Sequence, residues 1–173
     1  MAVLLNQVSN LRFRLDLVTR KSDGTIEPAS LEASFAVERY KHIAAGERGE
    51  HRFVPLIALA GRTLLDMDVI TFLTALEAAL GGPGGAAALE ASAEPSLALR
   101  VAGGPEAYLV EVGIDLLGLL EPVAGDRGSA GGDLALFRFT ANARAVAAFC
   151  TALIEEFGRF PTDPSKVRPG DAA

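Results

Sequence analysis

Apolar and polar residues alternate in two segments near the N-terminus, which is the pattern of strands with one buried and one solvated face. The first segment covers residues 11–18. Lys21-Ser22-Asp23-Gly24 is a turn signal that separates it from the second segment. We therefore expect the two strands to pair. The second segment places on one side Leu31, Ala33, Phe35 and Val37.

A third apolar segment follows a polar stretch at residues 41–52. It covers residues 53–59 and contains Pro55, which lacks a backbone N–H. A strand here is therefore expected at a sheet edge, or beginning after the proline. The polar stretch before it contains the two histidines of the chain, His42 and His51, and is expected to be a solvated connection.

Two segments have the spacing of amphipathic helices. The first runs from Asp66 to Leu80, with Asp66 or Asp68 available to accept first-turn N–H groups, and Gly81-Gly82-Pro83 is expected to end it. The second begins after Thr140 or Asn142 and ends at Gly158. Its apolar stripe is wide, which predicts deep burial.

Four further strands are predicted, at residues 87–91, 97–101, 108–117 and 134–139. The connections are too short for parallel crossovers, so an α+β fold is expected, with an antiparallel β-sheet of about six to seven strands and two α-helices packed on one face. No repeat is visible. Residues 1–161 are predicted to form a single α+β domain, and residues 162–173 a disordered C-terminal tail.

Charge and composition disfavour some classes of partner. The formal net charge is −6 and the pI about 4.9, which disfavours nucleic acid as a partner because the chain repels phosphate backbones. No apolar run is long enough to cross a membrane, and Met1 to Leu5 do not make a signal peptide. A cytoplasmic protein is therefore expected, and the single Cys150 agrees with a reducing compartment. We also expect a bacterial source.

The chain shows no motif that predicts a catalytic residue, a cofactor site or a metal site. Residues 81–85 are rich in glycine but follow a helix and lack the Lys-Ser/Thr of a phosphate-binding loop. Cys150 lies on the apolar stripe of the last helix, where packing is the expected role. His42 and His51 are expected to be solvated, although a hairpin would bring them together near Glu47 or Glu50.

Surface recognition is the remaining function. An antiparallel sheet with helices on one face leaves its other face open to a partner. The polar positions of the predicted strands would form that face, and we take as candidate partner-binding residues Arg12, Arg14, Asp16, Glu32, Glu111 and Asp115.

Several short segments resemble the WapI-type family of bacterial immunity proteins. They are Leu64-Leu65-Asp66, residues 76–80, Glu94-Pro95-Ser96-Leu97-Ala98-Leu99, the strand at 108–117 and the closing helix with Phe157-Gly158-Arg159-Phe160-Pro161. The resemblance implies a non-enzymatic cytoplasmic protein that binds and neutralises a cognate toxin. The chain has no tryptophan, which such families usually carry in the first helix and neighbouring strands. An acidic protein suits a basic toxin that attacks nucleic acid.

Two alternatives remain from the sequence. One is an interaction domain that forms a homodimer through the open sheet face or an edge strand. The other is an enzyme or a small-molecule-binding domain with a concave site that holds His42 or His51 beside carboxylates.

Overall fold

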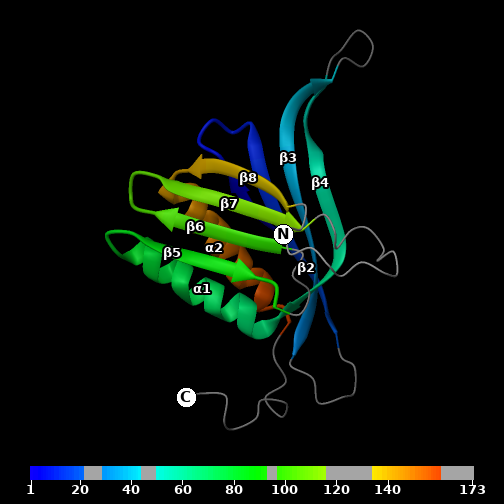
Figure 1. Cartoon of the computed structure of the whole chain (residues 1–173), viewed down its shortest axis with the longest axis vertical. Coiled ribbons are helices and arrows are strands. Elements are labelled where there is room, and N and C mark those ends of the chain that lie inside the picture. Colours follow the sequence, from blue (N-terminus) through cyan, green and yellow to red (C-terminus); the bar gives the residue numbers. More distant parts are fainter. Residues whose placement is uncertain (22–28, 44–49, 93–96, 116–133, 161–173) are drawn as a thin grey trace.

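The computed structural model describes residues 1–21, 29–43, 50–92, 97–115 and 134–160. They form two four-stranded antiparallel sheets and two helices (Figure 1). Sheet A has the order β1-β2-β3-β4, and sheet B the order β5-β6-β7-β8. The α+β class and the antiparallel pairing are confirmed. The single sheet of six to seven strands is wrong, because the chain leaves sheet A through the first helix and starts a second sheet.

Sheet A contains the longest strands of the structure. Its strands are β1 (Ala2–Leu5), β2 (Leu11–Lys21), β3 (Ser30–Ile43) and β4 (Glu50–Leu65). β4 is an edge strand, which agrees with Pro55 at this position. The polar stretch around His42 and His51 is not all connection, since β3 continues to Ile43 and β4 begins at Glu50. The upper ends of β3 and β4 extend beyond the body as a ribbon (Figure 1).

Sheet B is shorter and has an uninterrupted register. It consists of β5 (Gly85–Glu90), β6 (Leu97–Gly103), β7 (Tyr108–Asp115) and β8 (Leu134–Ala141). Each strand pairs with its neighbour without a register shift. In sheet A, by contrast, the register shifts once between β2 and β3 and twice between β3 and β4. Gly61, with a φ of +70°, lies in one of the irregular stretches of β4.

The helices have the predicted bounds. Helix α1 is Asp66–Gly81 and helix α2 is Ala143–Phe157. The Asp68 carboxylate accepts the Leu65 N–H at 3.2 Å, which satisfies a backbone donor at the start of α1. The Asn142 side chain accepts the Ala145 N–H at 2.8 Å and caps α2. Asp66 forms an ion pair, with its carboxylate 2.7 Å from the Arg20 guanidinium.

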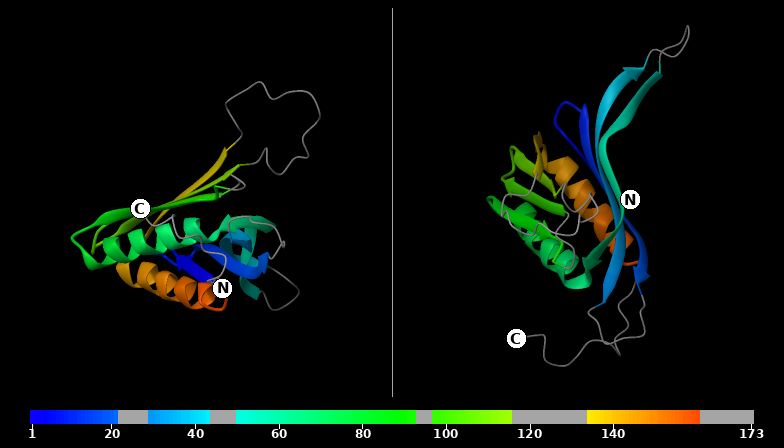
Figure 2. Two further views of the ribbon diagram at one scale, coloured as in Figure 1. Left: turned by 90° about the horizontal axis from the view of Figure 1, so that it is seen from below. Right: turned by 45° about the vertical axis from the view of Figure 1, so that its right-hand side comes forward.

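The order of elements is the same in both halves of the chain: four strands followed by one helix. Each helix packs on the first strand of the other half, α1 against β5 and α2 against β1. In the right-hand view of Figure 2, α2 lies between the two sheets. The sequence led us to expect both helices on one face of a single sheet. The structure has a different arrangement, because α2 lies between two sheets. The two halves thus share an order of elements that the residues do not reveal.

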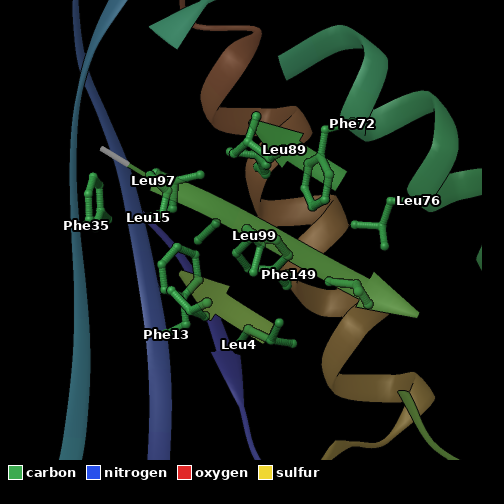
Figure 3. Packing of buried hydrophobic residues seen from close by; sticks show 14 of the residues in the cluster. Leu4, Phe13, Leu15, Phe35, Phe72, Leu76, Leu89, Leu97, Leu99 and Phe149 are labelled. Atoms are coloured by element: carbon green, nitrogen blue, oxygen red, sulfur yellow. The ribbon is translucent and has the colours of Figure 1, made fainter. Parts of the chain in front are cut away.

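A single buried cluster joins the two halves. Phe13 and Leu15 from sheet A meet Leu97 and Leu99 from sheet B, and Phe149 of α2 lies among them (Figure 3). The remaining members of this cluster also come from both sheets and both helices. The described residues share one core, and the single domain expected for residues 1–161 stays a prediction. The predicted tail at 162–173 lies outside the described residues.

Candidate functional site

The candidate residues lie on two separate faces. Arg12, Arg14, Asp16 and Glu32 occupy strands β2 and β3 of sheet A, whereas Glu111 and Asp115 occupy β7 of sheet B. Because the two sheets lie on opposite sides of α2 in Figure 2, these residues do not form one surface. Two candidate surfaces must therefore be considered.

The first surface is the outer face of sheet A. Arg12 donates from Nε to Oε2 of Glu38 at 2.5 Å, and Arg14 lies 3.9 Å from the other oxygen of the same carboxylate. Glu38 was not among the predicted residues, although it occupies a polar position of β3, the strand that carries Glu32. It is buried, and the two arginines offset the cost of burying its charge.

Aromatic side chains continue this face into the ribbon. The Tyr40 ring stacks on the His51 ring with centroids 5.6 Å apart, and Phe53 meets Tyr40 edge-on at 5.3 Å. The guanidinium of Arg12 lies 4.0 Å from the centroid of Phe53, a cation–π contact. We call Tyr40, His51 and Phe53 the aromatic cluster. The 42% exposure of Tyr40 keeps the cluster accessible.

The histidines lie opposite each other. His42 is the backbone partner of His51 in the β3–β4 register, as expected for a hairpin. The backbone of both residues lies in the ribbon. Among the residues whose placement the structure describes, no group of three or more His, Cys, Asp or Glu side chains is arranged to hold a metal ion.

The opposite face of the ribbon is cationic. Lys41 lies directly across from Arg52, and Arg39 occupies the same face one pair further along. All three side chains are exposed. We call them the cationic trio. Like charges directly opposite each other destabilise a strand pair, so the position of Lys41 against Arg52 carries a cost in the unliganded protein.

The second surface is the outer face of sheet B. One row across three strands places Arg100, Glu111 and Arg138 side by side in the register. Oε1 of Glu111 accepts a hydrogen bond from Nε of Arg138 at 2.7 Å, and Oε2 of Glu111 lies 3.6 Å from Nη1 of Arg100. Small residues and two exposed leucines surround this row. We call this set the sheet-B face, and it comprises Ala86, Ala88, Ala98, Arg100, Leu109, Glu111, Leu136 and Arg138.

Charge is distributed unequally between the two parts of the molecule. The strands of sheet A carry eight Lys and Arg and four Asp and Glu, whereas the two helices and sheet B carry three and eight. The net charge of −6 therefore conceals a basic part and an acidic part. Composition alone did not reveal this division, because it sums the whole chain.

Among the side chains that the structure describes, Cys150 and Glu156 have a shifted pKa, and both groups have structural roles. Burial raises the pKa of the Cys150 thiol, with a smaller contribution from Glu77. The Cys150 side chain packs in the core as predicted. Burial also raises the pKa of Glu156, helped by a hydrogen bond to Asp16 and opposed by the Met1 ammonium and the Leu17 N–H. Its carboxylate accepts the Leu17 N–H at 3.0 Å, which ties α2 to β2.

Searches against protein-family models, curated proteins and solved structures gave no match. None of the helices in the described ranges has the length and apolar character needed to cross a membrane. The two surfaces are therefore the features of this chain from which a function can be inferred.

Proposed function

We propose that this chain is a non-enzymatic bacterial protein that binds a protein partner through the sheet-B face, in the manner of an immunity protein that neutralises a toxin. The observation that carries the proposal is the exposure of Leu109 and Leu136, at 43% and 47%, on either side of the Arg100–Glu111–Arg138 row. Protein interfaces combine apolar contact with ion pairs of this kind.

The small side chains support a close approach. Ala86, Ala88 and Ala98 line β5 and β6 on this face and are exposed. A partner surface can therefore lie near the backbone of sheet B over a wide area, with the leucines inserted into it. Exposed leucines lose their contact with water on binding, which contributes roughly 25 cal/mol for each Å² that is buried.

The charge of this part of the molecule indicates the kind of partner. The helices and sheet B together carry eight acidic and three basic residues, which favours long-range encounter with a basic protein, while the sheet-B face itself carries Arg100 and Arg138 beside Glu111. Toxins that attack nucleic acid are basic because their substrate is a polyanion, which agrees with the resemblance to immunity proteins.

The test is affinity capture with matched variants. The tagged protein is incubated with lysate of its native host, and the retained proteins are identified by mass spectrometry. We expect wild type to retain a basic protein stoichiometrically, and the Leu109→Arg/Leu136→Arg variant to lose it. Ile154→Arg, an exposed position on α2, is the control and should retain the partner.

Neutralisation is then measured directly. The captured protein is expressed alone, and then together with each variant. The proposal requires that growth is impaired by the captured protein, restored by wild type and not restored by the sheet-B variant. Capture of no protein, or equal capture and growth with the sheet-B variant, would contradict it.

A further inference from the structure

The ribbon has a chemistry that the sheet-B face does not share. It projects beyond the body of the molecule (Figure 1) and carries the aromatic cluster on one face and the cationic trio on the other. We infer that this ribbon binds single-stranded nucleic acid, with bases stacked on the aromatic cluster and phosphates held by the cationic trio.

The cationic trio is the first reason. Lys41 faces Arg52 across the strands, an arrangement that costs stability unless an anion lies between or beside the two charges. No carboxylate whose side chain the structure describes pairs with Lys41, Arg52 or Arg39. A phosphate group would relieve the repulsion, and a chain of phosphates would match cations spaced along the strands.

The aromatic cluster is the second reason. Tyr40 and His51 already stack with their rings 16° from parallel, and the exposed Tyr40 ring offers its edge and remaining surface to a further ring. Bases present flat π-faces that stack on aromatic side chains whatever their sequence. Arg12 lies over Phe53 on the same face, where its charge is paired with Glu38. An acidic protein would satisfy the cationic trio but would not need this stacked arrangement.

The two faces can serve one ligand. A two-stranded ribbon is a single backbone layer thick, and Lys and Arg have long flexible stems that reach past the edge of a strand. β4 is the edge strand of sheet A, so a nucleic-acid strand running along it meets both kinds of side chain. Bases then lie against Tyr40 and Phe53, and phosphates lie near Arg52 and Lys41.

The acidic charge of the whole chain does not prevent this binding. At physiological ionic strength, charges further away than about 8 Å are largely screened. A ribbon that extends from the body therefore presents its own local charge to a ligand. Over residues 39–43 and 50–54, the two strands carry Arg39, Lys41 and Arg52 against one acidic residue, Glu50, which is an excess of positive charge. The expectation of no nucleic-acid partner came from the summed charge alone.

The test measures binding of a short fluorescein-labelled oligothymidylate by fluorescence anisotropy. Wild type should bind it at low salt, with a slope of log affinity against log salt of roughly −2, the value for three neutralised phosphates on a single strand. The Lys41→Gln/Arg52→Gln variant should bind about tenfold more weakly or worse and show a shallower slope.

The contribution of stacking is separated by a second variant. Tyr40→Leu keeps an apolar side chain but removes the ring, and should weaken binding about tenfold while leaving the salt slope unchanged. Arg100→Gln/Arg138→Gln is the matched control, since it removes two cations from the other sheet. It should bind as wild type does. Far-UV circular dichroism of each variant establishes that it is folded.

Two results would overturn the inference. One is the absence of oligothymidylate binding by wild type at low salt, or unchanged binding by both ribbon variants. The other is that poly-glutamate binds as tightly as the oligonucleotide, both to wild type and to Tyr40→Leu. That result would assign the ribbon to acidic proteins. The sheet-B variants of the capture experiment are separate from these, so either proposal can fail alone.

Discussion

The two sheets have the same strand order and opposite surface chemistry. Sheet B has an uninterrupted register and an outer face of small residues around one ionic row, whereas sheet A has register shifts, longer strands and a basic ribbon. The core is common to both, because side chains from each sheet enter one cluster. A single stable unit can therefore support two unrelated recognition surfaces, provided that the outer faces differ.

The largest expected effect comes from removing a ring from the shared core. Phe149 of α2 lies 6.2 Å from the Phe13 ring of sheet A and 6.5 Å from the Phe72 ring of α1. Phe149→Ala should lower the free energy of unfolding by about 4 kcal/mol, because it leaves a cavity where the halves meet. Urea denaturation should still show one transition. Two separate transitions would break the account of a common core.

The next effect comes from Arg20, which forms an ion pair within the first half and a hydrogen bond to the second. Arg20 of β2 pairs with Asp66 at the start of α1 and also donates to the Phe160 carbonyl oxygen beyond α2. Arg20→Met should lower the free energy of unfolding by about 3 kcal/mol, since Asp66 loses this partner for its buried charge. Arg159→Met, at an exposed position, serves as the control in the same urea titration. Equal stabilities of the two variants would contradict the proposed role.

A smaller effect is expected at an irregular stretch of β4. Gly61 of β4 has a φ of +70°, and a side chain added there would have space, with its nearest neighbour at 4.0 Å. Gly61→Ala should therefore cost only the backbone strain, about 1 kcal/mol in thermal or urea unfolding. Gly81→Ala is the comparison, because Gly81 has open space and no positive φ. Its stability should be unchanged or slightly higher.

The smallest effect is a change in pH dependence. The pKa of Glu156 is raised in the folded protein, mainly by burial, so the folded state binds this proton more tightly than the unfolded state does. The contribution of Glu156 to stability should fall as pH rises from its ordinary pKa through the raised value, and stay constant above it. Glu156→Gln lacks this fall, so its stability relative to wild type should increase with pH across that window.

Urea unfolding at a series of pH values measures this difference. Asp16 and the Met1 ammonium both face the Glu156 carboxylate and must be present in both proteins. The hydrogen bond from the Leu17 N–H is retained by the amide oxygen of glutamine, which makes the variant a suitable match. A difference that decreases with pH would contradict the direction of the shift.

Local pattern predicted the elements well and their assembly poorly. Both helices were predicted with their ends, because caps and glycine stops are encoded within a few residues, as at Asn142 and Gly158. Most strands were predicted from alternation. β1 was missed, because four apolar residues, Ala2 to Leu5, have no alternation to detect. The division into two sheets depends on long-range packing, such as α2 against β1, which no local pattern contains.

The candidate site was predicted in the same uneven way. Polar strand positions such as Arg12 and Glu111 are on outer faces, as alternation requires. Their separation onto two sheets was not predictable without the fold. The ribbon was not predicted, because residues 41–52 are polar and were interpreted as a connection. Only the β3–β4 register of the structure places Tyr40 opposite Phe53.

The most direct test of two chemically distinct surfaces is a chemical-shift titration of the labelled protein with oligothymidylate. The account predicts that amide signals of residues 39–41 and 51–54 move with increasing ligand, while those of β6, β7 and β8 stay in place. Shifts centred on the Arg100–Glu111–Arg138 row, or no shifts at low salt, would contradict the assignment of the polyanion site to the ribbon.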